Sequence, residues 1–159
     1  MNTRTFALIL GIILLLAGIA GFIPGLVSHG METMATGTAA PGDAGPAPAT
    51  AASYGYLLGL FPTNAIHNLV HIVWGLYGIV AYRSFAGARS FAKATAVVYA
   101  ILTIAGLIPG LNTLWGIVPL FGHDIWLHAL ITIAAAYFGF ARAVDTETVT
   151  ATTGPTSRV

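Results

Sequence analysis

Cysteine is absent from the 159 residues of the chain. This absence excludes disulfide bonds, iron–sulfur clusters and thiolate metal sites, all of which need cysteine sulfur. Charge is scarce as well, since 7% of the residues are Asp, Glu, Lys or Arg, compared with about 25% in a typical soluble domain. The 6 Lys and Arg residues are too few to form a basic surface for nucleic acid. We therefore expect no nucleic-acid partner.

The residues that are present are mostly apolar. Hydrophobic residues make up 57% of the chain, and the mean hydropathy is +0.84. Such a composition is typical of an integral membrane protein embedded in the lipid bilayer. Each crossing needs about 20 apolar residues and a connection, so the chain has room for about four crossings.

Four apolar runs fit that estimate. They predict membrane-spanning helices at about 5–27, 63–82, 91–111 and 123–142. These helices form one transmembrane domain, 1–143. The first run is about 22 residues long, beyond the ~7–15 residues of a signal-peptide core, so we interpret it as a spanning helix. Small and polar residues dominate 28–53 and 144–159, which predicts a flexible outer loop and a disordered cytoplasmic tail.

The basic residues indicate how the helices are oriented. They all lie near helix ends that share one side of the membrane: Arg4, Arg83, Arg89, Lys93, Arg142 and Arg158. Cytoplasmic segments of membrane proteins carry an excess of Lys and Arg. We therefore predict a multi-pass protein of the cell membrane with both termini in the cytoplasm. Loops 28–62 and 112–122 should lie on the outer side.

An internal repeat suggests the architecture. Ala20–Leu26 reads AGFIPGL and Ala105–Leu111 reads AGLIPGL, with six of seven positions identical. In the helices that follow, Gly59, Pro62, His67 and His71 correspond at one constant offset to Gly116, Pro119, Asp124 and His128. The repeat predicts an all-α, integral membrane four-helix bundle built by tandem duplication of a two-helix hairpin. The two copies would be related by a pseudo-twofold axis along the membrane normal.

Polar residues gather on the second predicted helix. Asn64, His67 and His71 occupy positions i, i+3 and i+7, so their side chains share one helix face. Polar groups in hydrocarbon must find partners inside the protein, so this face should point inward. The duplication places it opposite the matching face of the fourth helix, which carries Asp124 and His128.

This His/Asp cluster in the outer half of the bundle predicts either a structural polar plug or a metal site. The candidate ligands are His67, His71, Asp124 and His128, and the residues expected around them are Asn64, Asn68 and His123. Three imidazoles and one carboxylate suit zinc, copper or iron(II).

The plug and a haem site are the other two interpretations of the cluster. Its members could form a structural polar plug, in which hydrogen bonds of about 0.6 kcal/mol each hold the helices in register. Alternatively, His71 and His128 would be the axial ligands of a b-type haem on facing helices. The outer side offers no Arg or Lys to pair with haem propionates, which argues against haem.

The sequence also resembles a known family. The strings His67-Asn68-Leu69-Val70-His71 and Asp124-Ile125-Trp126-Leu127-His128, with Gly- and Ala-rich hairpins and a basic central loop, are similar to the small bacterial membrane proteins catalogued as domain of unknown function 4383. The resemblance covers about Phe6 to Arg142 apart from the long first loop. It implies the four-crossing architecture and no particular activity.

Two classes of function therefore remain. The protein is a binding module for a metal or haem, or an accessory or scaffolding subunit that packs against other membrane subunits or against itself. No Ser/His/Asp nucleophile arrangement is evident, so we expect a non-catalytic role. An enzyme acting on a lipid or quinone ranks third.

Overall fold

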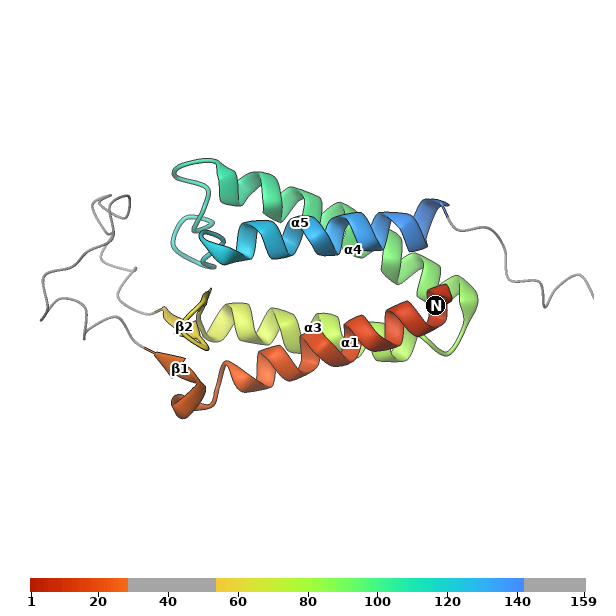
Figure 1. Ribbon diagram of the computed structural model, residues 1–159, viewed down its shortest axis with the longest axis horizontal. Coiled ribbons are helices and arrows are strands. Elements are labelled where there is room, and N and C mark those ends of the chain that lie inside the picture. The colour runs from red at the N-terminus through yellow and green to blue at the C-terminus, as the bar shows by residue number, and fades with distance from the viewer. Residues whose placement is uncertain (29–53, 142–159) are drawn as a thin grey trace, which may run out of the picture.

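The computed structural model describes residues 1–28 and 54–141, and this part of the chain is mostly helical (Figure 1). Its four α-helices are α1 (Thr3–Ala20), α3 (Ala65–Ala81), α4 (Phe85–Leu107) and α5 (His123–Ala136). A π-helical turn, η3 (Tyr137–Ala141), continues α5. The loop predicted within 28–53 and the tail predicted at 144–159 lie outside the described residues, apart from Ser28.

Three of these helices are long and apolar enough to cross a membrane: α1, α4, and α5 together with η3. The fourth, α3, is a shorter apolar helix of 17 residues. Large apolar side chains on the outer faces of the helices point away from the protein, and Leu16 and Ile133 are 60% and 68% exposed. These faces are compatible with embedding in lipid.

Local capping sets where the helices begin. The side chain of Asn2 accepts a hydrogen bond from the amide of Thr5 at 2.7 Å and caps α1. The hydroxyl of Ser84 accepts from the amide of Gly87 at 3.0 Å and caps α4. Because of this cap, α4 starts at Phe85, six residues before the predicted start, and the basic segment belongs largely to the helix.

Proline limits where two of the helices end. The predicted end of the first helix at 27 is wrong, because α1 stops at Ala20 and a short 3₁₀ turn, η1 (Pro24–Leu26), follows. Likewise α4 stops at Leu107, not at 111. Proline lacks an amide hydrogen and excludes the preceding residue from helical conformation, so Pro24 and Pro109 prevent either helix from continuing.

A small sheet was not predicted, so the described chain is not purely α-helical. Its strands are β1 (Val27–Ser28), β2 (Gly55–Leu57) and β3 (Phe61–Thr63), antiparallel in the order β1-β2-β3. The registers pair Val27 with Leu57 and Gly55 with Thr63. Because β3 takes up Thr63, α3 begins at Ala65 and not at 63.

The helices form two pairs. Helix α1 packs along α3, α4 packs along α5, and α4 also contacts both helices of the first pair. In Figure 1 the sheet and the 108–122 segment lie at one end of the molecule, which we call the sheet end. The N-terminus, residue 141 and the turn between α3 and α4 lie at the other, the terminal end.

Glycines allow the close approach of α1 and α3. A Cβ atom added at Gly75 would lie 2.5 Å from the backbone nitrogen of Leu15 and 2.7 Å from the carbonyl oxygen of Gly11. A Cβ atom added at Gly78 would lie 2.9 Å from the backbone of α1. The two helix backbones are therefore nearly in contact along this seam.

The core between the pairs is aromatic and aliphatic. The rings of Phe6 and Phe138 stack with centroids 4.5 Å apart, and Phe91 is fully buried. A partly buried polar contact joins the pairs, since the indole nitrogen of Trp74 donates to the hydroxyl of Thr95 at 3.0 Å. This packing fixes α3 against α4, and α4 also packs along α5. The polar residues of α3 and α5 are thereby held near each other.

Candidate metal site

Four side chains from two helices meet near the sheet end. His67 and His71 lie one turn apart on α3, and Asp124 and His128 lie one turn apart on α5. Asn64 orients the start of α3, because its side chain accepts a hydrogen bond from the amide of His67 at 2.8 Å. The sequence therefore aims two i, i+4 pairs at each other across the gap between the helix pairs.

The three imidazoles lie close together. One ligand nitrogen from each of His67, His71 and His128 lies within 4.8 Å of the others. The ring of His67 is centred 4.5 Å from that of His71 and 6.3 Å from that of His128. His67 and His128 are buried, at 4% and 2% exposure, whereas His71 is half-buried.

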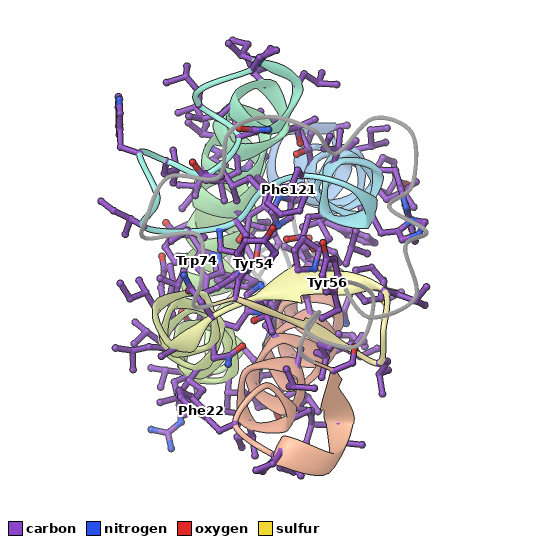
Figure 2. The ribbon with its side chains drawn as sticks, turned by 90° about the vertical axis from the view of Figure 1, so that its left-hand side faces the viewer. Phe22, Tyr54, Tyr56, Trp74 and Phe121 are labelled. Atoms are coloured by element: carbon purple, nitrogen blue, oxygen red, sulfur yellow. The ribbon has the colours of Figure 1, made fainter. Side chains whose placement is uncertain are left out.

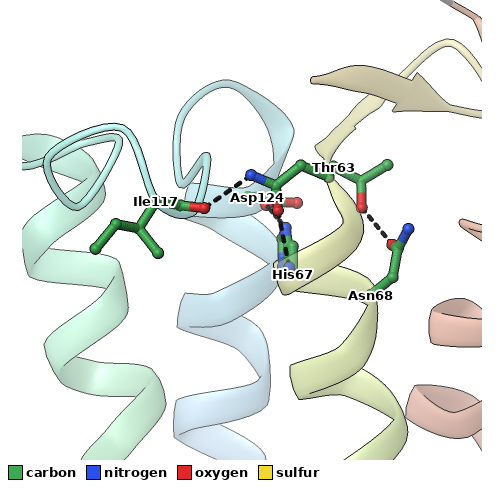
Figure 3. Close-up of polar contacts among 6 residues, drawn as sticks. Thr63, His67, Asn68, Ile117 and Asp124 are labelled. Carbon is green, nitrogen blue, oxygen red and sulfur yellow. Dashed lines mark hydrogen bonds and ion pairs between the residues drawn. The ribbon is translucent and has the colours of Figure 1, made fainter. Parts of the chain in front are cut away.

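Asp124 contacts the histidine cluster at His67. One of its carboxylate oxygens lies 3.8 Å from Nδ1 of His67, as Figure 3 shows, and its side chain is buried. Asp124 also lies in the first turn of α5, where the helix dipole favours a negative charge. The carboxylate would therefore stabilise the start of α5 whether or not it also takes part in the cluster.

Several polar atoms of the cluster have no hydrogen-bond partner. Within residues 1–28 and 54–141 these are Nδ1 of His67, Oδ2 of Asp124 and Nδ1 of His128, all buried. A buried polar atom without a partner costs about 1–3 kcal/mol. Three such atoms in one place are the feature of the site that most needs an explanation.

Asn64 and Asn68, two of the residues predicted to surround the ligands, form hydrogen bonds with other parts of the chain. The Asn64 amide donates to the carbonyl of Ile117 at 2.7 Å and ties α3 to the segment before α5. Asn68 accepts a hydrogen bond from the hydroxyl of Thr63 at 2.5 Å (Figure 3), and a Cβ atom at Gly21 would collide with it, so it faces α1. Neither contact involves an imidazole of the cluster.

His123, the third of these residues, lies outside the cluster. It is exposed, and its Nδ1 accepts a hydrogen bond from the indole of Trp126 at 2.9 Å. Its ring also contacts that of Phe61 edge to face, with centroids 6.2 Å apart. His123, Trp126 and Phe61 thus form part of the surface at the sheet end.

Sequence reasoning missed Tyr99 of α4. Its ring is buried and stands perpendicular to that of His128, with centroids 5.0 Å apart. A tyrosine in the middle of a predicted apolar crossing was the available signal, because its hydroxyl needs a polar neighbour. Tyr99 thus forms one wall of the site.

Aromatic side chains cover the sheet end above the cluster. Tyr54 lies between the two helix pairs, as Figure 2 shows, with its ring 5.9 Å from that of Tyr56 and 5.3 Å from that of Phe121. Phe22 lies away from this group at the edge of the molecule (Figure 2). The contact with Phe121 connects the small sheet to the segment that leads into α5.

Comparison with known proteins identifies one family. The family described as a domain of unknown function (DUF4383) matches residues 4–141, which is nearly the whole described chain, and the resemblance seen in the sequence is thereby confirmed. No curated protein matches the chain. No solved structure matches it either.

Proposed function

The chain belongs to this family, whose description assigns no activity, and we propose from the site itself that it is a membrane protein that binds one divalent transition-metal ion. The ion would be held by His67, His71 and His128, with Asp124 beside them. Imidazole ligands suit zinc, copper(II) and iron(II), and the absence of cysteine disfavours softer thiolate chemistry.

The observation that carries this proposal is the set of unpartnered buried atoms. A polar plug would stabilise the helices only if its members were hydrogen-bonded to one another. Instead, Nδ1 of His67 and of His128 is buried without a bond among the described residues. A metal ion bound to the other nitrogen of His67 would let Nδ1 of His67 donate to Asp124, and the ion could bind Nδ1 of His128 directly, so all three unpaired atoms would gain a partner. This supports a metal over a plug.

The spacing of the histidines fits a metal after a small adjustment. Nitrogens bound to one tetrahedral zinc at 2.0–2.1 Å lie about 3.3 Å apart. The three ring nitrogens lie within 4.8 Å of one another, so closure around an ion needs roughly 1.5 Å, which side-chain rotations can supply.

Haem is the weaker alternative. A porphyrin would have to lie between the proposed axial ligands His71 and His128. The ring of His67 is centred 4.5 Å from that of His71 and 6.3 Å from that of His128, so it lies beside both ligands, where the macrocycle would have to extend. Binding haem would require its displacement.

Matching hydrogen bonds support the proposed duplication. Arg4 donates to the carbonyl of Tyr82 at 3.0 Å, and Arg89 donates to the carbonyl of Gly139 at 3.0 Å. The two arginines are 85 positions apart, as are the two copies of the repeated heptapeptide. The two acceptors are 57 positions apart, as are the histidines at the ends of the two polar motifs.

Matching turns support it as well. Leu58 and Gly59 have φ values of 53° and 72°, and Trp115 and Gly116, 57 positions later, have 57° and 84°. A positive φ is uncommon for a residue other than glycine. The same rare conformation at equivalent places argues for a common origin of the two hairpins, which would close into a four-helix bundle around the site.

The duplication would also explain where the site lies. His67 and Asp124 are equivalent positions in the two copies, and their side chains approach to 3.8 Å. A twofold operation brings a position next to its own copy only near the axis. The cluster would therefore sit on the pseudo-twofold axis of the bundle, where both halves contribute ligands.

The proposed orientation follows from charge. Arg4 lies in the first turn of α1, Arg83 in the turn between α3 and α4, and Arg89 and Lys93 in the first half of α4. The terminal end would therefore face the cytoplasm under the positive-inside rule. The sheet end, with the cluster beneath it, would face outward in a multi-pass arrangement.

Elemental analysis of the detergent-purified protein tests the metal. We expect one ion per chain in the wild type and a large loss in His71→Ala and His128→Ala. His123→Ala is the matched control, because this histidine is exposed and bonded to Trp126. A metal-free wild type, or equal metal in all variants, would refute the proposal. Metal-free protein that co-purifies with other membrane subunits would favour the accessory-subunit alternative.

A further inference from the structure

We propose, on the basis of the metal site proposed above, that Asp124 orients His67 and does not bind the ion, and that a small monovalent anion or hydroxide occupies an open coordination position. The site would then be a three-histidine centre able to accept a ligand from outside the protein. This arrangement is typical of metal sites that react or exchange ligands, whereas fully coordinated sites are structural.

The ligand distances separate Asp124 from the histidines. The group whose ligand atoms all lie within 4.8 Å of one another consists of His67, His71 and His128. Asp124 is outside this group and approaches Nδ1 of His67 at 3.8 Å. Its carboxylate thus lies behind one imidazole and not at the point where the three rings converge.

This placement suits a carboxylate that orients a ligand. An imidazole binds a metal through one nitrogen, and the other usually donates a hydrogen bond to a carboxylate or carbonyl. Nδ1 of His67 faces Asp124 and makes no direct hydrogen bond among the described residues, although the ring also interacts with the backbone of Pro62. Binding of the ion through Nε2 would leave Nδ1 protonated toward Asp124, and both unpartnered atoms would be satisfied together.

Among the described residues, charge balance favours an anion at the open position. A divalent ion with three neutral imidazoles carries two positive charges, and Asp124 compensates for one of them. Within residues 1–28 and 54–141 Asp124 is the sole acidic residue, so no second negative charge is available there. Net charge is costly in a site with little water. A monovalent anion on the metal would make the site neutral.

The exposure of the histidines indicates where such an anion would enter. His67 and His128 are buried, whereas the side of the cluster formed by His71 is only half-buried. An exogenous ligand would therefore reach the ion beside His71.

Cobalt(II) substitution provides the test. The full-length protein in detergent is loaded with Co²⁺ and titrated with azide while the visible absorption bands are recorded. We expect azide to shift the bands of the wild type. Asp124→Asn should bind Co²⁺ about 10–100-fold more weakly, the range for loss of a group that orients a ligand. Once loaded it should still shift its bands with azide, at lower azide concentrations because one compensating negative charge is gone. His123→Ala should behave as the wild type.

The outcomes distinguish this inference from the metal proposal. If the wild type binds Co²⁺ without responding to azide while Asp124→Asn responds, Asp124 itself occupies the fourth position and the inference is wrong. If the wild type binds no Co²⁺, the metal proposal fails and the inference fails with it. The wild-type titration alone decides whether a position is open, so an unstable Asp124→Asn protein would not obscure the result.

Discussion

Replacement of Gly75 by alanine tests how tightly the seam between α1 and α3 supports the site. The added methyl group would lie 2.5 Å from the Leu15 nitrogen and 2.7 Å from the Gly11 oxygen, whereas ordinary contacts begin at 3.4 Å. Both obstacles are backbone atoms, which cannot rotate away. The helices must therefore separate by about 1 Å, and overpacking of this kind costs roughly 1–3 kcal/mol.

Unfolding of the detergent-solubilised protein, followed by circular dichroism, measures this cost. Gly25→Ala is the matched control, because nothing lies within 4 Å of a Cβ atom at Gly25. We expect a lower free energy of unfolding for Gly75→Ala and no change for the control. Gly75 also lies one turn after His71 on α3, so metal affinity should fall in Gly75→Ala and stay constant in Gly25→Ala. Equal stability of the two variants would refute the packing described here.

Two further predictions concern the halves of the chain and their orientation. Arg4→Met and Arg89→Met should each lower the free energy of unfolding by about 1 kcal/mol, because each removes a side-chain bond to a backbone carbonyl; a loss in only one of the two variants would count against the duplication. Since the chain has no cysteine, Trp115→Cys should react with a membrane-impermeant maleimide on intact cells and Arg83→Cys only after lysis. The reverse pattern would invert the proposed orientation.

The helices themselves could be predicted from hydropathy, but their ends depend on local details. Runs of apolar residues are sufficient to indicate each helix. The start of α4 is set by the hydroxyl of Ser84, one polar atom in a segment whose arginines suggested a loop. The small sheet escaped prediction for a different reason. Its strands of 2 or 3 residues are too short to show an alternating pattern, and the pairing of β1 with β2 spans a long interval of sequence, which periodicity cannot reveal.

The candidate site, like the fold, could be predicted only in part from the sequence. Spacing along α3 and α5 suggested that His67, His71 and His128 would share an interior, because i, i+4 geometry is local. The direction of Asn68 could not be found in this way. It is one residue beyond His67, so it projects from a neighbouring part of the helix, and its contact with Thr63 depends on how β3 leads into α3. Whether the three histidines bind a metal stays a prediction.

The pairing of β1 with β2 has a practical consequence for engineering the protein. Ser28 lies opposite Tyr56, so the polypeptide leaves and re-enters the sheet end at neighbouring points. Whatever length of chain joins them, the entropic cost of closing it changes by only about 0.6 kcal/mol for each doubling. An epitope or fluorescent reporter spliced into residues 29–53 should therefore leave the helices undisturbed, giving a handle for imaging or affinity capture without fusion to either terminus.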